Sequence, residues 1–278
     1  MSSPKPEVTI ITIGHSVRQE LQRFLPAVEE HAGVPFEVIY VDNASTDDTL
    51  DWLRETHPDV TVIELQENVW DGARNPALSR ARGRYTMFLD SDALLTPNAL
   101  PAMVEAMDEH PQWGLIGPRL VYPDGTLQLS CRRFPPRLLP LMRRPPLSWL
   151  LEDSRPVQRH LMADADHTRT RPVLYMISAC LLFRTEIGRQ IGPLDETIGL
   201  GGSADVDWGL RWSTTGMSGI YFPGATVIHD YRRTSNKAPL SRDAWRHLRA
   251  FVRLQWKYRG QRRSLIRLAD QLDQSVSS

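Results

Sequence analysis

Short apolar segments alternate with longer amphipathic segments through the first ninety residues of the chain. Runs of β-branched and aromatic residues are typical of buried strands, and apolar positions three or four residues apart are typical of half-buried helices. Strands are predicted in this way at 8–13, 36–41, 60–65 and 85–89, and helices at 18–30, 49–56 and 73–81. Because strands alternate with helices, the pattern favours a Rossmann-like α/β fold, with a mostly parallel sheet and helices on both faces.

The second half of the chain is less regular. Residues 173–183 form an apolar run that predicts a buried strand, since it is far shorter than the roughly 20 residues that span a bilayer. Another strand is predicted over 220–228. Six prolines between 132 and 156 exclude a long helix there and indicate a loop-rich excursion.

The segment 241–268 has a helical pattern that combines apolar residues, two of them tryptophans, with many arginines. Two interpretations remain open. A basic helix with tryptophans is able to lie on an anionic membrane. Alternatively, an apolar stripe that includes Trp245, Phe251 and Trp256 packs on the rest of the protein and the arginines are solvated.

Acidic residues follow two of the predicted strands. Asp42 follows 36–41, and Asp90 and Asp92 follow 85–89. The carboxyl ends of parallel strands meet at one edge of a sheet, where ligands bind, so we expect these carboxylates to lie on the same edge. Two hard oxygen donors suit a divalent cation that also contacts phosphate. The alternative is that Asp90 ends a strand and Asp92 begins a turn or caps a helix.

An ordered set of motifs between residues 8 and 232 resembles the family 2 glycosyltransferases of the GT-A fold. The motifs are Asp-Asn-Ala-Ser-Thr-Asp-Asp-Thr at 42–49, Gly-Ala-Arg-Asn at 72–75, Phe-Leu-Asp-Ser-Asp at 88–92, Ile-Ser-Ala-Cys-Leu-Leu-Phe-Arg at 177–184, Asp-Val-Asp-Trp-Gly-Leu-Arg at 205–211 and Val-Ile-His at 227–229. The segment 123–135 is similar to one in the rhamnosyltransferase-like branch of that family.

The resemblance implies a metal site for Mn²⁺ or Mg²⁺. Asp92 corresponds to the direct ligand, and Asp90 reaches the metal or the ribose through water. His229 resembles the histidine that supplies a further metal or phosphate contact, and a neutral imidazole suits such a site. Without the family context, a histidine at a strand end is more often a satisfied polar group.

The resemblance also implies a nucleotide site that includes Asp90. Asp42 corresponds to the acid that accepts the imide N–H of uracil or thymine, and its alternative role is to cap a turn. Arg74 is expected to contact phosphate or base, or else to be an exposed helix arginine. His15 is expected to contact base or phosphate, or else to be an exposed loop residue.

The catalytic base implied by the resemblance is Asp205, because a hydroxyl acceptor must lose its proton as it attacks. Asp207 is the alternative base, or a residue that stabilises the helix N-terminus. Ala204 stands where the family has a glutamate, and 199–203 is a glycine-rich stretch that we expect to be a loop closing on the donor. Arg211 is expected to pair with an acid of its own helix, or else to contact phosphate.

These features predict an inverting, metal-dependent glycosyltransferase that uses dTDP-L-rhamnose or a UDP-sugar. The acceptor is expected to be a hydroxyl of a glycan, a lipid-linked glycan or a small molecule. The alternative is a non-catalytic nucleotide-sugar-binding or scaffold protein, which the loss of the glutamate at Ala204 makes conceivable. We expect a nucleotide-sugar half at 1–122, an acceptor half at 123–232 and a C-terminal helical segment at 233–278.

Composition limits the setting of the protein. Residues 1–110 contain 8 Lys and Arg against 19 Asp and Glu, whereas residues 111–278 contain 25 against 14. An acidic nucleotide half needs a cation to hold a diphosphate, and a basic second half suits an anionic acceptor or membrane surface. Cys131 and Cys180 form no zinc or disulfide pattern, and no signal peptide is visible. We therefore expect a cytoplasmic protein, with peripheral contact at the inner membrane face and no nucleic-acid partner.

Overall fold

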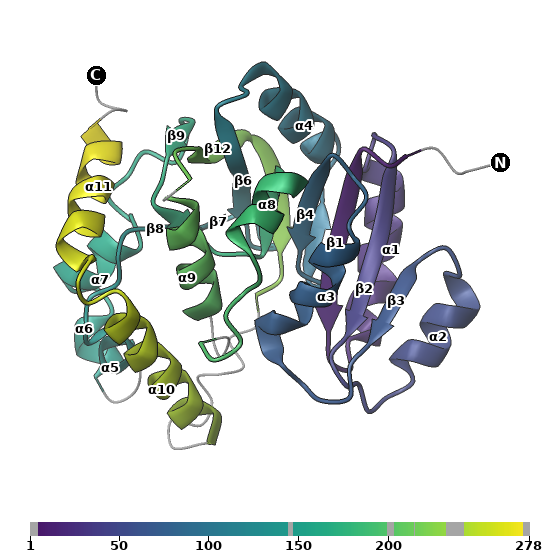
Figure 1. Ribbon diagram of the computed structural model, residues 1–278, viewed down its shortest axis with the longest axis horizontal. Coiled ribbons are helices and arrows are strands. Elements are labelled where there is room, and N and C mark those ends of the chain that lie inside the picture. The colour runs from purple at the N-terminus through teal and green to yellow at the C-terminus, as the bar shows by residue number, and fades with distance from the viewer. Residues whose placement is uncertain (1–4, 144–146, 199–202, 214, 232–241, 275–278) are drawn as a thin grey trace.

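The centre of the protein is a mixed sheet covered by helices (Figure 1). The computed structural model describes residues 5–143, 147–198, 203–213, 215–231 and 242–274. Its strands are β1 Val8–Gly14, β2 Phe36–Asp42, β3 Thr61–Glu64, β4 Tyr85–Leu89, β5 Ala93–Leu95, β6 Trp113–Val121, β7 Leu127–Gln128, β8 Cys131–Arg132, β9 Arg171–Pro172, β10 Tyr175–Met176, β11 Cys180–Arg184 and β12 Ser218–His229. The helices are α1 Arg18–His31, α2 Thr49–Thr56, the 3₁₀-helix η1 Trp70–Ala73, α3 Arg74–Arg80, α4 Ala99–Glu109, α5 Leu139–Met142, α6 Ser148–Leu151, α7 Arg155–His160, α8 Thr185–Ile191, α9 Ser203–Trp212, α10 Arg242–Lys257 and α11 Arg262–Gln274.

Four parallel strands form one side of the sheet. The strand order is β3-β2-β1-β4-β11-β6-β12-β5, and β1 is parallel to both β2 and β4. Gly14 at the end of β1 lies opposite Asp42 at the end of β2. The carboxyl ends of β2 and β4 therefore share one edge of the sheet, and the predicted common position of Asp42, Asp90 and Asp92 is confirmed.

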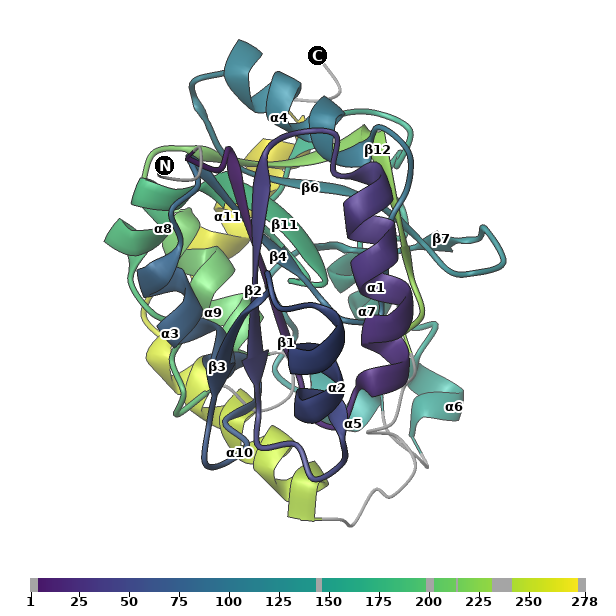
Figure 2. The ribbon, with the colours of Figure 1, turned by 90° about the vertical axis from the view of Figure 1, so that its right-hand side faces the viewer.

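Helices cover both faces of the sheet, as predicted. On one face, α1 and α4 bury Leu21, Phe24 and Leu100 against β1, β4 and β6. On the other face, α3, α8 and α9 pack on the same strands, and Trp208 and Trp212 of α9 lie in that core. Figure 2 shows α1 on one side of the strands and α3, α8 and α9 on the other. The fold is thus the α/β arrangement expected from the sequence.

The single strand predicted over 173–183 is wrong. The segment is divided into β10, which pairs with β8 in a separate two-stranded sheet, and β11, which is antiparallel to β4 and β6. Between them the backbone N–H of Ser178 donates to the carboxylate of Asp205 at 3.2 Å. Because this amide bonds to a side chain, the ladder is interrupted and the chain passes from one sheet to the other.

The C-terminal segment is helical, as predicted, and forms two helices. α10 ends at Lys257 and α11 begins at Arg262, with Gly260 in the turn between them. Phe251, Leu254 and Tyr258 are buried, so an apolar stripe does pack on the protein. Trp245 and Trp256, which were expected in that stripe, are 64% and 67% exposed. Figure 1 shows α10 beside α9, on the side of the molecule away from α1 and α2.

Where the structure describes the proline-rich segment, its helices are the short α5, α6 and α7, as the prolines predict. Among the helices that the structure describes, none has the length and apolar character needed to cross a membrane. The glycine-rich stretch 199–202 and the segment 232–241 that precedes α10 lie outside the described residues.

Candidate functional site

Asp42 lies at the end of β2 and shapes the turn that follows. Its side chain is 2% exposed and accepts hydrogen bonds from the backbone N–H of Ser45 at 2.9 Å, from the Ser45 hydroxyl and from the Tyr40 hydroxyl at 3.2 Å. The predicted turn-capping role is therefore present. Nearby, the exposed His15 places Nδ1 3.0 Å from the backbone oxygen of Asn43, so β1 and β2 bring the two predicted nucleotide contacts to one edge.

Asn43 holds the segment that leads into η1. Its amide oxygen accepts from the Val69 N–H at 2.8 Å, and its amide nitrogen donates to the Trp70 oxygen at 3.2 Å. Trp70 has a φ of 57°, a left-handed conformation that is unusual for a residue other than glycine. The Asn43 clamp maintains this turn, which carries Asp71 toward the site.

Arg74 is buried between two acids. The guanidinium is 2% exposed, lies 3.3 Å from Asp71 and forms an ion pair with Asp90. The predicted alternative of an exposed helix arginine is therefore wrong, because η1 and α3 turn this side chain inward. Burial and the nearby charge of Asp205 raise the pKa of Asp71 to about 7, although Arg74 acts in the opposite direction.

Asp90, Asp92 and His229 form a cluster that suits a metal ion. Their ligand atoms all lie within 4.8 Å of one another. β5 is antiparallel to β12 and pairs Ala93 with His229, so the residue that follows Asp92 lies opposite the histidine. His229 Nε2 is 3.3 Å from Asp92, and Nδ1 is 2.6 Å from the amide oxygen of Gln128. The three residues predicted as metal ligands are thus brought together.

Asp90 and His229 of this cluster both have raised pKa values. Burial raises the pKa of Asp90, and the nearby Asp92 carboxylate acts in the same direction, while Arg74 opposes it. Burial alone would lower the pKa of His229, but the hydrogen bond and charge of Asp92 outweigh it and the pKa is raised. Two carboxylates and an imidazole that compete for protons in this way are the donors that a hard or intermediate cation takes.

Asp205, the predicted base, is fixed by the turn between β10 and β11. Its carboxylate accepts from the hydroxyl of Ser178 at 2.6 Å and from the Ser178 N–H at 3.2 Å. The next residue, Ala179, accepts a backbone hydrogen bond from Asp90 at 2.9 Å. Asp205 therefore lies beside the acids of the metal cluster. Ala204, which precedes it, is fully buried in the apolar core of α9.

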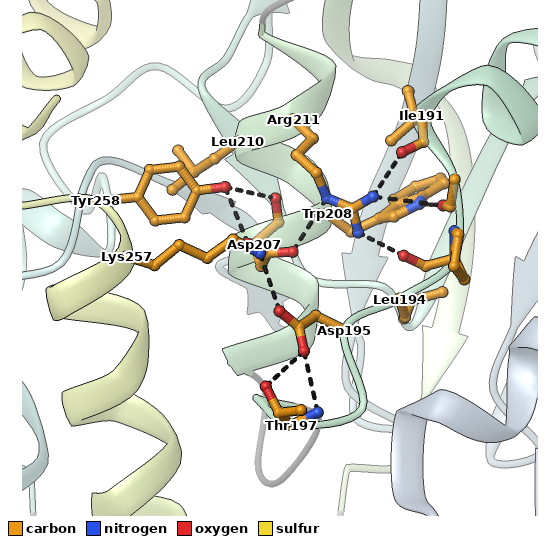
Figure 3. A network of polar contacts seen from close by, with 12 residues as sticks. Ile191, Leu194, Asp195, Thr197, Asp207, Trp208, Leu210, Arg211, Lys257 and Tyr258 are labelled. Carbon is orange, nitrogen blue, oxygen red and sulfur yellow. Dashed lines mark hydrogen bonds and ion pairs between the residues drawn. The ribbon is translucent and has the colours of Figure 1, made fainter.

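Asp207 has a different environment (Figure 3). The side chain is completely buried, and its oxygens contact Arg211 Nε at 3.0 Å, Lys257 Nζ at 2.6 Å and the Tyr258 hydroxyl at 3.0 Å. Lys257 also pairs with Asp195 at 2.9 Å. The expected pairing of Arg211 with an acid of its own helix is confirmed. This network fastens α9, and with it Asp205, to α10.

Four residues that hold the site together are not predicted by the sequence. They are Asn43, Asp71, Gln128 and Ser178. Gln128 and Ser178 lie inside recognised motifs, but their partners are 101 and 27 residues away in the chain. Sequence spacing alone gives no signal for such contacts. Asp71 directly precedes the Gly-Ala-Arg-Asn motif at 72–75, so its position beside that motif is a sequence signal for a site residue.

Comparison with known proteins agrees with this geometry. The family model for glycosyl transferase family 2 matches residues 9–192. The chain belongs to glycosyl transferase family 2. It is 24% identical over 278 aligned residues to an N-acetylglucosaminyl-diphospho-decaprenol L-rhamnosyltransferase of Mycobacterium tuberculosis. The alignment covers 93% of the chain and 87% of the relative. It is also 35% identical over 131 residues to the putative teichuronic acid biosynthesis glycosyltransferase TuaG of Bacillus subtilis, covering 45% of the chain and 52% of that relative.

Solved glycosyltransferases share the fold. A structure of GalNAc-T7 with UDP, GalNAc and Mn²⁺ matches 92% of the chain with a TM-score of 0.67 at 14% identity, and the chain spans 49% of that protein. The mannosyltransferase PcManGT from Pyrobaculum calidifontis, in complex with GDP-Man and Mn²⁺, matches 93% of the chain and 76% of its own length, with a TM-score of 0.58 at 19% identity. This family 2 glycosyltransferase therefore has the GT-A fold, and it is an enzyme related to rhamnosyltransferases.

Proposed function

We propose that this enzyme transfers a sugar, with inversion, from a pyrimidine-nucleotide sugar to a hydroxyl of a lipid-linked acceptor. The observation that supports this most strongly is the convergence of Asp90, Asp92, His229 and Asp205 at one edge of the sheet. Transfer of a sugar from a nucleoside diphosphate to a hydroxyl needs a group that stabilises the leaving diphosphate and a base that accepts the hydroxyl proton. A metal site beside a carboxylate provides both.

The metal ligands are proposed to be Asp92, Asp90 and His229. Because Nδ1 of His229 faces the amide oxygen of Gln128, it carries the proton and leaves Nε2 available as a ligand. This donor set fits Mn²⁺ or Mg²⁺, and the bound ion would act as a Lewis acid toward the leaving diphosphate. Arg74 holds Asp90 in place from the buried side.

The nucleotide base is proposed to lie against Asp42. A carboxylate has about four acceptor positions, and the hydrogen bonds from Ser45 and Tyr40 do not use all of them. An acceptor matches the imide N–H of uracil or thymine. We place His15 beside the base, because it lies on the same edge, and we place Arg74 near the phosphates through Asp90.

The general base is proposed to be Asp205. It lies beside the proposed metal ligands, because the turn that holds it is bonded to Asp90, and its hydrogen bonds to Ser178 fix its orientation. Asp207 is fully enclosed by cations and a tyrosine, so it is not placed to take a proton from an acceptor hydroxyl. The side chain of Asp207 instead positions α9.

The donor and acceptor are proposed from the relatives. The L-rhamnosyltransferase of Mycobacterium tuberculosis supports dTDP-L-rhamnose as donor and a sugar-diphospho-lipid as acceptor. A lipid acceptor implies work at a membrane surface, which we place at its cytoplasmic face. The exposed Trp245, Val252 and Trp256 of α10 are suited to contact lipid headgroups.

The test is a thermal-shift and transfer experiment on the purified enzyme. UDP and dTDP should stabilise the protein more than GDP or ADP, and Mn²⁺ or Mg²⁺ should increase the effect. A ligand at 100 times its dissociation constant adds about 2.7 kcal/mol to the free energy of unfolding. Transfer of rhamnose from dTDP-L-rhamnose to an N-acetylglucosaminyl-diphospho-lipid is expected. A preference for GDP would contradict the role of Asp42.

A further inference from the structure

Arg132 ends β8 and Arg133 directly follows it, yet the two arginines have different partners. Arg133 forms ion pairs with Asp164 at 2.8 Å and with Asp273 of α11 at 2.6 Å, and the second pair ties the residue after β8 to α11. Arg132 donates from Nη1 only to the backbone oxygens of Leu129 and Cys131, each at 2.7 Å. Arg133 therefore has a structural role, whereas the contacts of Arg132 do not neutralise its charge.

The charge of Arg132 has no carboxylate partner among the side chains that the structure describes. These include every Asp and Glu of the chain except Asp243. Three other inward-facing arginines are paired with acids: Arg74 with Asp71 and Asp90, Arg171 with Asp273, and Arg211 with Asp207. Burial lowers the pKa of Arg132, and the nearby guanidinium of Arg143 acts in the same direction. A half-buried guanidinium is unfavourable without an anion, so this position favours an anionic ligand.

Arg132 is linked to both parts of the proposed catalytic centre through neighbouring tyrosines. In the β8–β10 ladder it pairs with Tyr175, which stands shortly before the Ser178 that holds Asp205. On another side, Tyr231 lies within electrostatic range of Arg132 and places its ring 5.6 Å from that of His229. An anion bound by Arg132 would thus lie on the side of the site where these tyrosines adjoin the Asp205 turn and His229.

We propose that Arg132, with Arg143 beside it, forms a phosphate-binding subsite that takes a diphosphate group, which we assign to the lipid-linked acceptor. This inference rests on the proposed function. The planar guanidinium donates two parallel hydrogen bonds to phosphate oxygens, which a lysine cannot match. The nucleotide of the donor is proposed to bind the half of the protein formed by β1–β4, and β8 lies outside that half. We therefore favour the acceptor as the source of the diphosphate group. The diphosphate of the donor is the other source of the same chemistry.

The experiment measures the affinity of Arg132→Gln for three probes by calorimetry: farnesyl diphosphate, farnesol, and UDP with Mn²⁺. Loss of a charge-assisted contact should weaken farnesyl diphosphate binding about tenfold or more. Binding of farnesol and of UDP with Mn²⁺ should stay as in the wild type. Arg132→Lys, which retains the charge but not the fork, should be intermediate. Arg137→Gln, an exposed arginine of the same segment, is the matched control and should bind all three probes normally.

The outcomes separate the subsite from the proposed function. A loss confined to UDP with Mn²⁺ supports the phosphate subsite and assigns it to the donor. If a folded Arg132→Gln protein, verified by its thermal unfolding, binds both diphosphates as tightly as the wild type does, the subsite is refuted and the proposed function is untouched. If the wild type itself binds neither UDP with Mn²⁺ nor farnesyl diphosphate, the proposed function fails.

Discussion

The carboxylate of Asp205 accepts two hydrogen bonds from Ser178, one from its hydroxyl at 2.6 Å and one from its backbone N–H at 3.2 Å. Ser178 lies where the chain crosses from the small sheet to the central sheet. The adjoining Ala179 accepts a backbone hydrogen bond from Asp90. This turn therefore fixes the distance between the proposed base and the proposed metal ligands.

Replacement of the base tests this arrangement. General-base assistance is typically worth about 10² to 10⁴ in rate, so Asp205→Asn should lower kcat by a factor in that range. Donor affinity, which is assigned to other residues, should change little. Transfer and donor hydrolysis are measured beside calorimetric binding of the donor. Nearly unchanged kcat would exclude Asp205 as the base, and a wild type that binds donor without any turnover would favour the non-catalytic alternative.

Disruption of the network around Asp207 should reduce the stability of the protein more than its catalytic rate. Lys257→Met leaves buried Asp207 without one of its cations, and we expect the free energy of unfolding to fall by about 2 kcal/mol. Asp207→Asn should behave likewise and reduce kcat less than Asp205→Asn does. Urea denaturation measures the effect. Arg249→Gln, an exposed cation on the same helix, is the control and should unfold as the wild type does.

Buried His160 predicts a pH dependence of stability. It is 4% exposed, its Nδ1 lies 2.7 Å from the Arg133 oxygen, and burial together with the charge of Arg132 lowers its pKa to about 3. Between pH 6.5 and pH 3 the unfolded chain binds a proton at this histidine that the folded protein does not, so stability falls as the pH decreases through that window. At pH 5 the loss should be about 2 kcal/mol.

Comparison with His160→Gln isolates this contribution. Between pH 7 and pH 5 the wild type should lose more unfolding free energy in denaturant titrations than the variant does. Titrating carboxylates are common to both proteins and cancel in the difference. Parallel curves for the two proteins would show that His160 is not the cause.

Most of the fold follows from local sequence patterns, because strands and helices in the first half have clear periodicity and lengths. Asp42, Asp90 and Asp92 could be placed together since parallel strands fix where their ends lie. The break within 173–183 was missed because it depends on a hydrogen bond between Ser178 and Asp205, which are 27 residues apart. The enclosure of Asp207 was missed for a similar reason, since Lys257 and Tyr258 come from a helix whose docking no local pattern encodes.

The most direct test of the account is metal-enhanced nucleotide binding by Asp92→Asn. UDP affinity is measured by calorimetry with and without Mn²⁺, in the wild type, in Asp92→Asn and in Asp124→Asn, which alters an exposed aspartate. We expect Mn²⁺ to tighten UDP binding in the wild type and in Asp124→Asn, and to have no effect in a folded Asp92→Asn protein. If Asp92→Asn keeps both the metal enhancement and normal turnover, the metal site is not at Asp90, Asp92 and His229.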